Sequence, residues 1–285
     1  MPLRPPVHAD DRWYPSRRAE LIRRLTEFVP ERDDACEAVA VVAPHAGYDY
    51  SGAVAGAAYA RVVVPGDVVL LSLHHRPSSG PAFALFDEGV WQTPLGDVPI
   101  ATQLVAAIAA ECPMVEADCR VHFDEHSGEL HVPFLQFRNP HVRIAPICIT
   151  HATAASACEL GESLARAVER LGRPALLVAS TDLSHEQPQR APSGAGILSG
   201  ENLRDYVCRQ DDKVLDRILA LDAKGLWETR EREGVTMCGF APVTAALAYA
   251  KARGATRAEL VEHTTSADVS GSYHYIVGYA GVIIR

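Results

Sequence analysis

Three apolar runs divide the sequence, and each ends in a polar cluster. Residues 38–43 contain only alanine and valine, and the runs at 68–73 and 175–179 are similarly rich in small and branched apolar side chains. Such runs are typical of strands that are buried on both faces of a sheet. Segments with apolar residues three or four positions apart lie between and after them, which is the spacing of helices. The pattern predicts an α/β fold.

The same patterns place the remaining elements. Helices are expected at 17–29, 51–62, 102–111, 124–135, 154–171, 202–221, 223–232 and 243–253. Further strands are expected at 83–86, 90–98, 115–121, 142–149, 258–264 and 275–284, those at 90–98 as a hairpin. Residues 187–200 are rich in Pro, Gly and Ser, which favours a loop. Neither a repeat nor a linker divides the sequence, so we expect residues 1–285 to form a single domain.

Histidines follow all three apolar runs. His45 follows the first run, His74 and His75 follow the second, and His185 ends the segment Ser180-Thr181-Asp182-Leu183-Ser184-His185 after the third. Open α/β sheets bind ligands beyond the carboxyl ends of their strands. Neutral imidazole is the commonest metal ligand in proteins. The sequence therefore predicts a metal site at this edge of the sheet.

Other residues with reactive side chains lie near these histidines in the sequence or follow similar signals. Asp182 could fix the orientation of the His185 imidazole or cap a turn. His126 and Glu129 are three positions apart and would share a helix face, either as an acid–base pair or as exposed residues. Cys238 precedes a helix, a position that lowers the pKa of a thiol. From the residues alone, a small buried side chain remains the favoured interpretation of Cys238.

Composition and charge exclude several classes of function. The formal net charge of the 285 residues is −9, with acidic and basic residues interspersed, and nucleic-acid binding would require a basic patch. Apolar stretches are only strand-length, so no membrane span is expected, and residues 1–6 lack the apolar core of a signal peptide. Seven cysteines without paired spacing favour a reduced, cytoplasmic protein. Zinc-finger, Gly-x-Ser-x-Gly and phosphate-loop motifs are absent from the sequence.

Motifs spread over nearly the whole chain resemble those of the MEMO family, also called AmmeMemoRadiSam system protein B. They are Arg12-Trp13-Tyr14-Pro15, Ala43-Pro44-His45-Ala46-Gly47-Tyr48, Asp124-Glu125-His126-Ser127-Gly128-Glu129-Leu130-His131-Val132-Pro133, Ser180-Thr181-Asp182-Leu183-Ser184-His185, Met237-Cys238-Gly239, Thr265-Ser266-Ala267-Asp268-Val269-Ser270-Gly271 and Val277-Gly278-Tyr279-Ala280. The resemblance implies a three-layer α/β/α sandwich around a central mixed sheet, as in class III extradiol dioxygenases.

The resemblance also implies a ligand set and catalytic residues. The metal would be held by His45, His74 and Cys238, with the cysteine where the dioxygenases use a glutamate. His185 would match their acid–base histidine, with Asp182 beside it. Iron(II) is the implied metal, with copper or zinc as alternatives. Residues expected to contact substrate or support the ligands are Tyr48, His75, His126 and Glu129.

One motif departs from the family pattern. Family members carry Gly-Pro-Asn-His or Gly-Pro-Ser-His at the second histidine, whereas this chain reads Leu71-Ser72-Leu73-His74. The imidazole is kept, but the loss of glycine and proline changes the turn that precedes it.

The function implied by the resemblance is that of a metal-binding redox protein, a dioxygenase-like oxidoreductase that acts on a small molecule. A thiolate in place of a carboxylate ligand makes the site softer, so ring cleavage does not follow from the fold. Two alternatives remain open: a non-catalytic protein that binds a peptide or small ligand in the same pocket, and a zinc-dependent hydrolase. The family association implies radical-SAM and AMMECR1-like partners.

Overall fold

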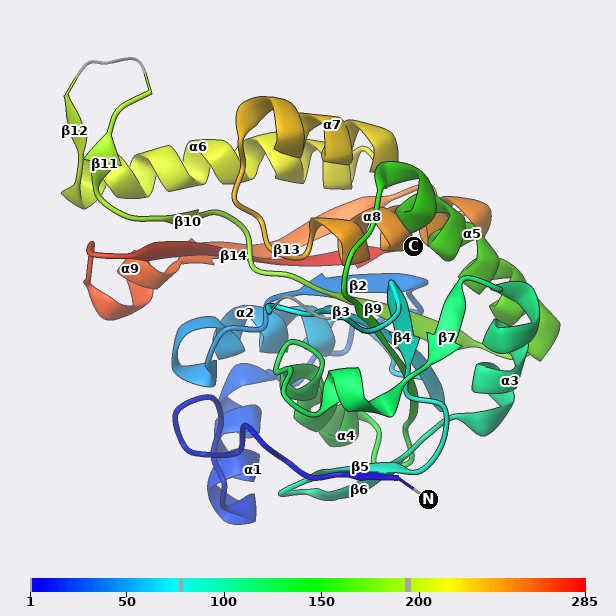
Figure 1. The fold of residues 1–285 in the computed structure, drawn as a ribbon. Coiled ribbons are helices and arrows are strands. Elements are labelled where there is room, and N and C mark those ends of the chain that lie inside the picture. Colours follow the sequence, from blue (N-terminus) through cyan, green and yellow to red (C-terminus); the bar gives the residue numbers. More distant parts are fainter. Residues whose placement is uncertain (1, 77–78, 193–195) are drawn as a thin grey trace.

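A nine-stranded mixed sheet forms the centre of the computed structural model, which describes residues 2–76, 79–192 and 196–285 (Figure 1). Its strands run in the order β10-β14-β2-β9-β3-β8-β4-β7, with β13 paired to β14. They are β2 (Ala40–Ala43), β3 (Asp67–Leu73), β4 (Phe83–Leu85), β7 (Val115–Ala117), β8 (Arg143–Ile149), β9 (Ala175–Ser180), β10 (His185–Glu186), β13 (Ala258–Thr265) and β14 (Ile276–Ile284).

The three strands that precede the histidines are neighbours. β9 lies between β2 and β3 and is parallel to both, and β8 continues the parallel set beside β3. β14 is antiparallel to β2, and β4 is antiparallel to β8, so the sheet is mixed. Parallel neighbours end at the same edge, so the residues that follow β2, β3 and β9 meet there. This arrangement confirms the expected mixed sheet.

Helices cover both faces of the sheet (Figure 1). On one face α2 (Tyr48–Ala60) packs on β2, β13 and β14, and it contacts α1 (Arg18–Phe28) and α4 (Val132–Arg138). On the other face α8 (Phe240–Ala252) packs on β2, β3 and β9. α5 (Ala154–Leu171) and α7 (Ala223–Glu233) pack on α8, α3 (Thr102–Glu111) packs on α5, and α6 (Gly200–Leu219) packs on α7. The fold is therefore a three-layer α/β/α sandwich, as expected.

Smaller elements complete the chain. β1 (Leu3–Arg4) joins the hairpin of β5 (Val90–Thr93) and β6 (Gly96–Pro99), which confirms the hairpin expected at 90–98. β11 (Gln189–Arg190) and β12 (Ile197–Leu198) pair within the expected loop at 187–200, of which residues 193–195 lie outside the described residues. A short helix, α9 (Ser266–Ser270), precedes β14.

The expected helix at 124–135 is wrong in its first half. Residues 124–128 are irregular, a 3₁₀ turn spans Glu129–His131, and α4 begins only at Val132. Side chains of the irregular segment bond to other parts of the chain: the Ser127 hydroxyl donates to the Leu73 carbonyl, and Glu125 accepts from the backbone N–H of His75. Such bonds compete with helix formation.

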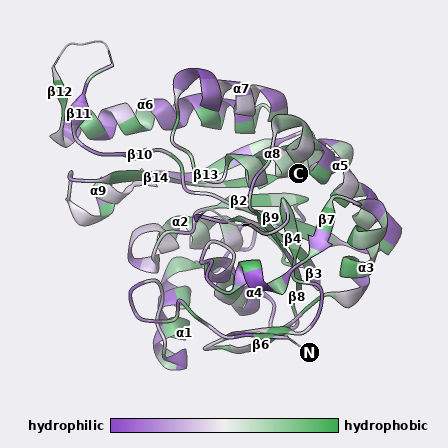
Figure 2. Cartoon of the chain, in the orientation of Figure 1, coloured by the Kyte–Doolittle hydropathy of each residue, from purple (hydrophilic) through white to green (hydrophobic). Residues whose placement is uncertain are grey.

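Apolar side chains are concentrated on the central strands. β2 is buried along its whole length, and the hydropathy colouring shows the apolar residues of the sheet enclosed between helices that carry polar residues outward (Figure 2). The largest buried cluster contains residues from Tyr14 to Ile284. Among the described residues, no helix combines the length and the apolar character needed to cross a membrane.

Candidate metal centre

Three imidazoles gather at the carboxyl edge of the central strands. His45 follows β2, His75 follows β3, and His126 comes from the irregular segment before α4. One ligand nitrogen from each ring lies within 4.8 Å of those of the other two. The rings of His75 and His126 are stacked with centroids 4.4 Å apart, and the His45 ring meets His75 edge-on at 5.2 Å. This spacing suits a single ion between three nitrogens.

A buried hydroxyl fixes the tautomer of His45. The Nδ1 atom of His45 lies 2.6 Å from Ser180 Oγ. The Ser180 hydroxyl donates its one hydrogen to the Ser127 carbonyl at 2.7 Å. The imidazole must therefore be the donor in its own bond with Ser180, which leaves His45 Nε2 with a free lone pair.

A second buried histidine supports the same hydroxyl. His131 Nε2 lies 2.8 Å from Ser180 Oγ, and the Tyr59 hydroxyl lies 2.9 Å from His131 Nδ1. Because Ser180 has no hydrogen left to give, His131 donates from Nε2 and accepts the Tyr59 proton at Nδ1. His131 is completely buried and acts as a structural residue behind His45.

Glu125 plays the corresponding part for His75. Its Oε1 atom lies 2.9 Å from His75 Nδ1, and its Oε2 accepts the backbone N–H of His75 at 2.8 Å. Burial alone would raise the pKa of Glu125, but hydrogen bonds from His75 and electrostatic interactions with His75 and His126 lower it to about 2. Because a carboxylate only accepts, the Nδ1 atom of His75 carries a proton, and in the neutral ring Nε2 is the nitrogen with the lone pair.

Cys238 reaches the cluster from the start of α8. Its Sγ lies 3.3 Å from His45 Nε2 and accepts the backbone N–H of Asp182 at 3.3 Å. The next residue, Gly239, packs so closely that a Cβ there would lie 2.2 Å from the Ser180 carbonyl oxygen. Burial, and then the nearby Asp182 carboxylate, raise the pKa of Cys238, which is opposite to the effect of a helix N-terminus.

Asp182 and His185 are not partners, contrary to the expectation. Asp182 Oδ1 accepts the backbone N–H groups of His45 at 2.8 Å and Ala46 at 3.3 Å, so the carboxylate holds the turn after β2. Burial raises the pKa of Asp182 to about 7. The partner of His185 Nδ1 is the hydroxyl of Tyr275, at 3.1 Å. The other ring nitrogen, His185 Nε2, is buried and has no hydrogen-bond partner among the residues that the structure describes.

His74, the expected second ligand, lies outside the cluster. Its Nδ1 bonds the Arg76 carbonyl at 2.7 Å, and its side chain lines a separate cavity with Asp118 and Arg120. Successive side chains along an extended segment point to opposite sides, so only one of the two adjacent histidines can face the site. The structure gives that place to His75. The residues that precede His75 are Ser72, Leu73 and His74.

Two further expected site residues serve the core instead. The hydroxyl of Tyr48 donates to the Leu130 carbonyl at 2.7 Å, and its ring packs against Phe134. Glu129 accepts the Tyr14 hydroxyl at 2.7 Å and pairs with Arg4 at 2.7 Å. Because residues 124–128 are not helical, Glu129 does not share a face with His126.

Sequence reasoning missed the residues that orient the imidazoles. Glu125 and Ser127 flank His126, and Ser180 ends β9. All three belong to the motifs quoted above. Proximity in sequence to His126 points to Glu125 and Ser127, whereas Ser180 meets His45 only through the pairing of β2 with β9.

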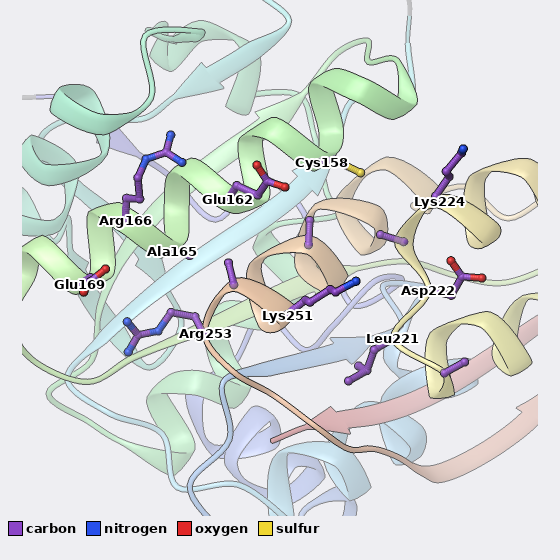
Figure 3. Close-up of a pocket in the computed structure, with 14 residues that line it drawn as sticks. Cys158, Glu162, Ala165, Arg166, Glu169, Leu221, Asp222, Lys224, Lys251 and Arg253 are labelled. Atoms are coloured by element: carbon purple, nitrogen blue, oxygen red, sulfur yellow. The ribbon is translucent and has the colours of Figure 1, made fainter.

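Several surface cavities lie away from the clustered histidines. One of about 700 Å³ lies between α5, α8 and the turn after α6, and its walls carry charges of both signs, including Glu162, Arg166 and Lys251 (Figure 3). None of the clustered histidines lines it. Cavity size therefore does not locate the candidate metal centre, whereas the convergence of imidazoles does.

Buried neutral histidines make stability depend on pH. Burial is the largest cause that lowers the pKa of His122 and of His131 to about 3 each. In the unfolded chain both would have a pKa near 6.5. Below that pH the unfolded state binds more protons, so the free energy of unfolding decreases as the solution becomes more acidic.

We therefore expect metal-free protein to lose about 2 kcal/mol of unfolding free energy per buried histidine between pH 8 and pH 5. Urea denaturation across this range measures the loss. His131→Gln should reduce the loss of unfolding free energy between pH 8 and pH 5 by the contribution of one buried histidine. His141→Gln, at an exposed position, should leave that loss unchanged. A stability that stays level down to pH 5 would contradict this interpretation.

Comparison with known proteins places the chain in a family. A model of the Memo-like protein family matches residues 4–283. A MEMO1 family protein of Methanopyrus kandleri is 36% identical over 288 residues, covering 96% of each chain. Another, of Methanothermobacter thermautotrophicus, is 37% identical over 84% of this chain and 82% of its own. The chain belongs to the Memo-like family. A solved, uncharacterized protein of Escherichia coli K12 is 14% identical, covering 86% of this chain and 99% of its own, with a TM-score of 0.49.

The residues of this Memo-like protein fit a transition metal. His45 and His75 each present an Nε2 lone pair because the other ring nitrogen is committed. A third donor is available from His126, within the imidazole cluster, or from Cys238, beside His45. Nitrogen and sulfur donors of this kind suit iron, copper and zinc. A further buried polar atom without a partner among the described residues is His185 Nε2, whose ring interacts electrostatically with His75.

Proposed function

We propose that this Memo-like protein is a metal-dependent oxidoreductase that acts on a small molecule. His45 and His75 would hold the metal together with Cys238 or His126, and His185 would be the acid–base residue. Iron(II) is the metal we propose, since two imidazoles and a softer donor suit it and since the dioxygenase-like resemblance implies it. Bound there, iron would supply redox chemistry with O₂.

One observation carries this proposal. β2 and β3, which flank β9, deliver His45 and His75 to one edge, and separate buried groups, Ser180 and Glu125, bond Nδ1 of each ring so that Nε2 is the lone-pair nitrogen of the neutral imidazole. Metal-ligating histidines usually have their second ring nitrogen bonded in this way. Packing alone does not require two buried histidines to direct their Nε2 lone pairs to the same place.

His185 has a ring nitrogen free to exchange a proton. Burial is the largest cause that lowers the pKa of His185 to about 4, followed by electrostatic interaction with His75, so its ring is neutral at pH 7. Tyr275 holds Nδ1, and the unpartnered Nε2 is the atom that could take a proton from a substrate hydroxyl and return it later. Asp182 contributes by fixing the backbone of His45 and Ala46 rather than by transferring protons.

Oxygen uptake tests the proposed reaction. Metal-free protein would be reconstituted anaerobically with iron(II) or zinc and mixed with small hydroxylated aromatic compounds in aerated buffer. We expect substrate-dependent O₂ consumption with iron only. His185→Ala should retain its iron and lose about 10²–10⁴-fold in rate, the usual contribution of an acid–base residue.

Two other results would overturn the oxygenase proposal. Hydrolytic turnover with zinc and no O₂ uptake with iron would support a zinc-dependent hydrolase. Small-ligand or peptide binding of equal strength with and without metal, with no turnover, would support a binding protein.

A further inference from the structure

Residues Glu125, His126 and Ser127 form a short segment that bonds the chain just after β3. The Ser127 hydroxyl donates to the Leu73 carbonyl at 2.8 Å, and the Leu73 N–H points back to the same hydroxyl at 3.3 Å. Two residues on, the His75 N–H donates to Glu125 Oε2. The segment therefore fixes the backbone that leads into His75 through bonds within the protein alone.

The Glu125 carboxylate is fully engaged within this segment. It is 4% exposed, and its Oε1 atom faces three donors: His75 Nδ1 at 2.9 Å, the Ser127 N–H at 2.8 Å and His126 Nδ1 at 3.3 Å. Its Oε2 accepts the His75 N–H at 2.8 Å. One carboxylate thus contacts two of the three clustered imidazoles, which stack on each other.

We propose that Glu125 is the positioning residue of the metal centre, which sets the ring orientation and tautomer of His75 and holds His126 against it. The inference rests on the proposed metal-binding function and adds to it the residue that prepares two of the donor rings. Ser127 helps to orient the third ring, His45. Its carbonyl accepts a hydrogen bond from the Ser180 hydroxyl, which in turn bonds His45 Nδ1.

Glutamine cannot replace this carboxylate. If its amide oxygen occupied the Oε1 position, the NH₂ group would face the His75 N–H, and donor would meet donor. If the amide were turned round, the NH₂ group would face His75 Nδ1 and the Ser127 N–H. Either way one donor pair is unsatisfied, so Glu125→Gln should release the His75 ring. Asp124→Asn is the matched control, since Asp124 is exposed and adjacent.

The test has two readouts. Nitrogen-15 NMR of the metal-free wild type should show His75 protonated on Nδ1, and Glu125→Gln should shift the ring toward the Nε2–H tautomer. Cobalt(II) titration should show affinity about 10–100-fold lower in Glu125→Gln, the usual cost of losing a supporting partner. Asp124→Asn should match the wild type in both.

The outcomes separate this inference from the proposed function. A wild-type His75 with its proton on Nε2, or a Glu125→Gln variant with unchanged tautomer and affinity, would overturn the positioning role. A wild type that binds no metal while His75 keeps its Nδ1–H tautomer, and loses it in Glu125→Gln, would overturn the metal function and leave the positioning role standing. Because the NMR readout on the wild type needs no variant, it decides the matter even if Glu125→Gln fails to fold.

Discussion

His75→Ala should lose metal affinity by more than about 100-fold, whereas His74→Ala should bind metal as the wild type does. The expected loss exceeds the ~10–100-fold that removal of a supporting residue costs, because a donor atom itself is removed. Only His75 belongs to the imidazole cluster, while His74 bonds the Arg76 carbonyl outside it. Anaerobic cobalt(II) titration of both variants measures the difference.

His74→Ala serves as the control for His75→Ala because the two positions are adjacent. Both variants remove one imidazole from the same turn, so general effects on folding are matched. Loss of affinity in His74→Ala with binding retained in His75→Ala would support the ligand set implied by the family resemblance and contradict the one we propose.

Arg4→Ala should cost about 3–5 kcal/mol of unfolding free energy, the usual effect of breaking a buried ion pair. The Arg4 side chain is fully buried, and its Nη1 lies 2.7 Å from Glu129 Oε2. It also donates to the carbonyls of His122 and Glu125, each at 2.8 Å, and lies over the Trp91 ring. Its loss removes the guanidinium from a buried carboxylate that keeps only its contacts with His8 and Tyr14, and frees the segment that carries His126.

Guanidinium denaturation of metal-free protein measures the effect. Arg4→Met combined with Glu129→Gln should recover part of the lost stability, because the uncompensated charge is removed with its partner. Arg32→Ala, which breaks an exposed pair with Asp34, should change stability little. Equal effects of Arg4→Ala and Arg32→Ala would show that the buried network does not hold the N-terminal segment.

The framework of the fold could be predicted from the sequence because its signals are local. Unbroken apolar runs identified β2, β3 and β9, and helical spacing identified α3 and α5 with the bounds found in the structure. Parallel strands with histidines at their ends also predicted the edge at which the imidazoles meet. These inferences need only periodicity and the rule that ligands lie beyond strand carboxyl ends.

The detailed roles of the site residues could not be predicted because they depend on contacts between distant segments. Which of His74 and His75 faces the cluster depends on where the alternation of side chains along β3 ends. Glu125, 50 residues away in the sequence, bonds His75 and so holds that ring toward the cluster. Helical spacing predicts that Glu129 lies in the site, but its carboxylate bonds Arg4 and Tyr14 in the core. Asp182 was paired with His185 on proximity in sequence, yet it bonds the backbone after β2.

Elemental analysis of protein purified without oxygen tests the central claim most directly. The wild type would be measured beside His45→Ala and Cys238→Ala, with circular dichroism to confirm that each variant is folded. We predict close to one iron per wild-type chain, lost in His45→Ala, with the content of Cys238→Ala showing whether the thiol or His126 supplies the third donor. A folded wild type that holds no metal even after reconstitution with iron, copper or zinc would contradict the account.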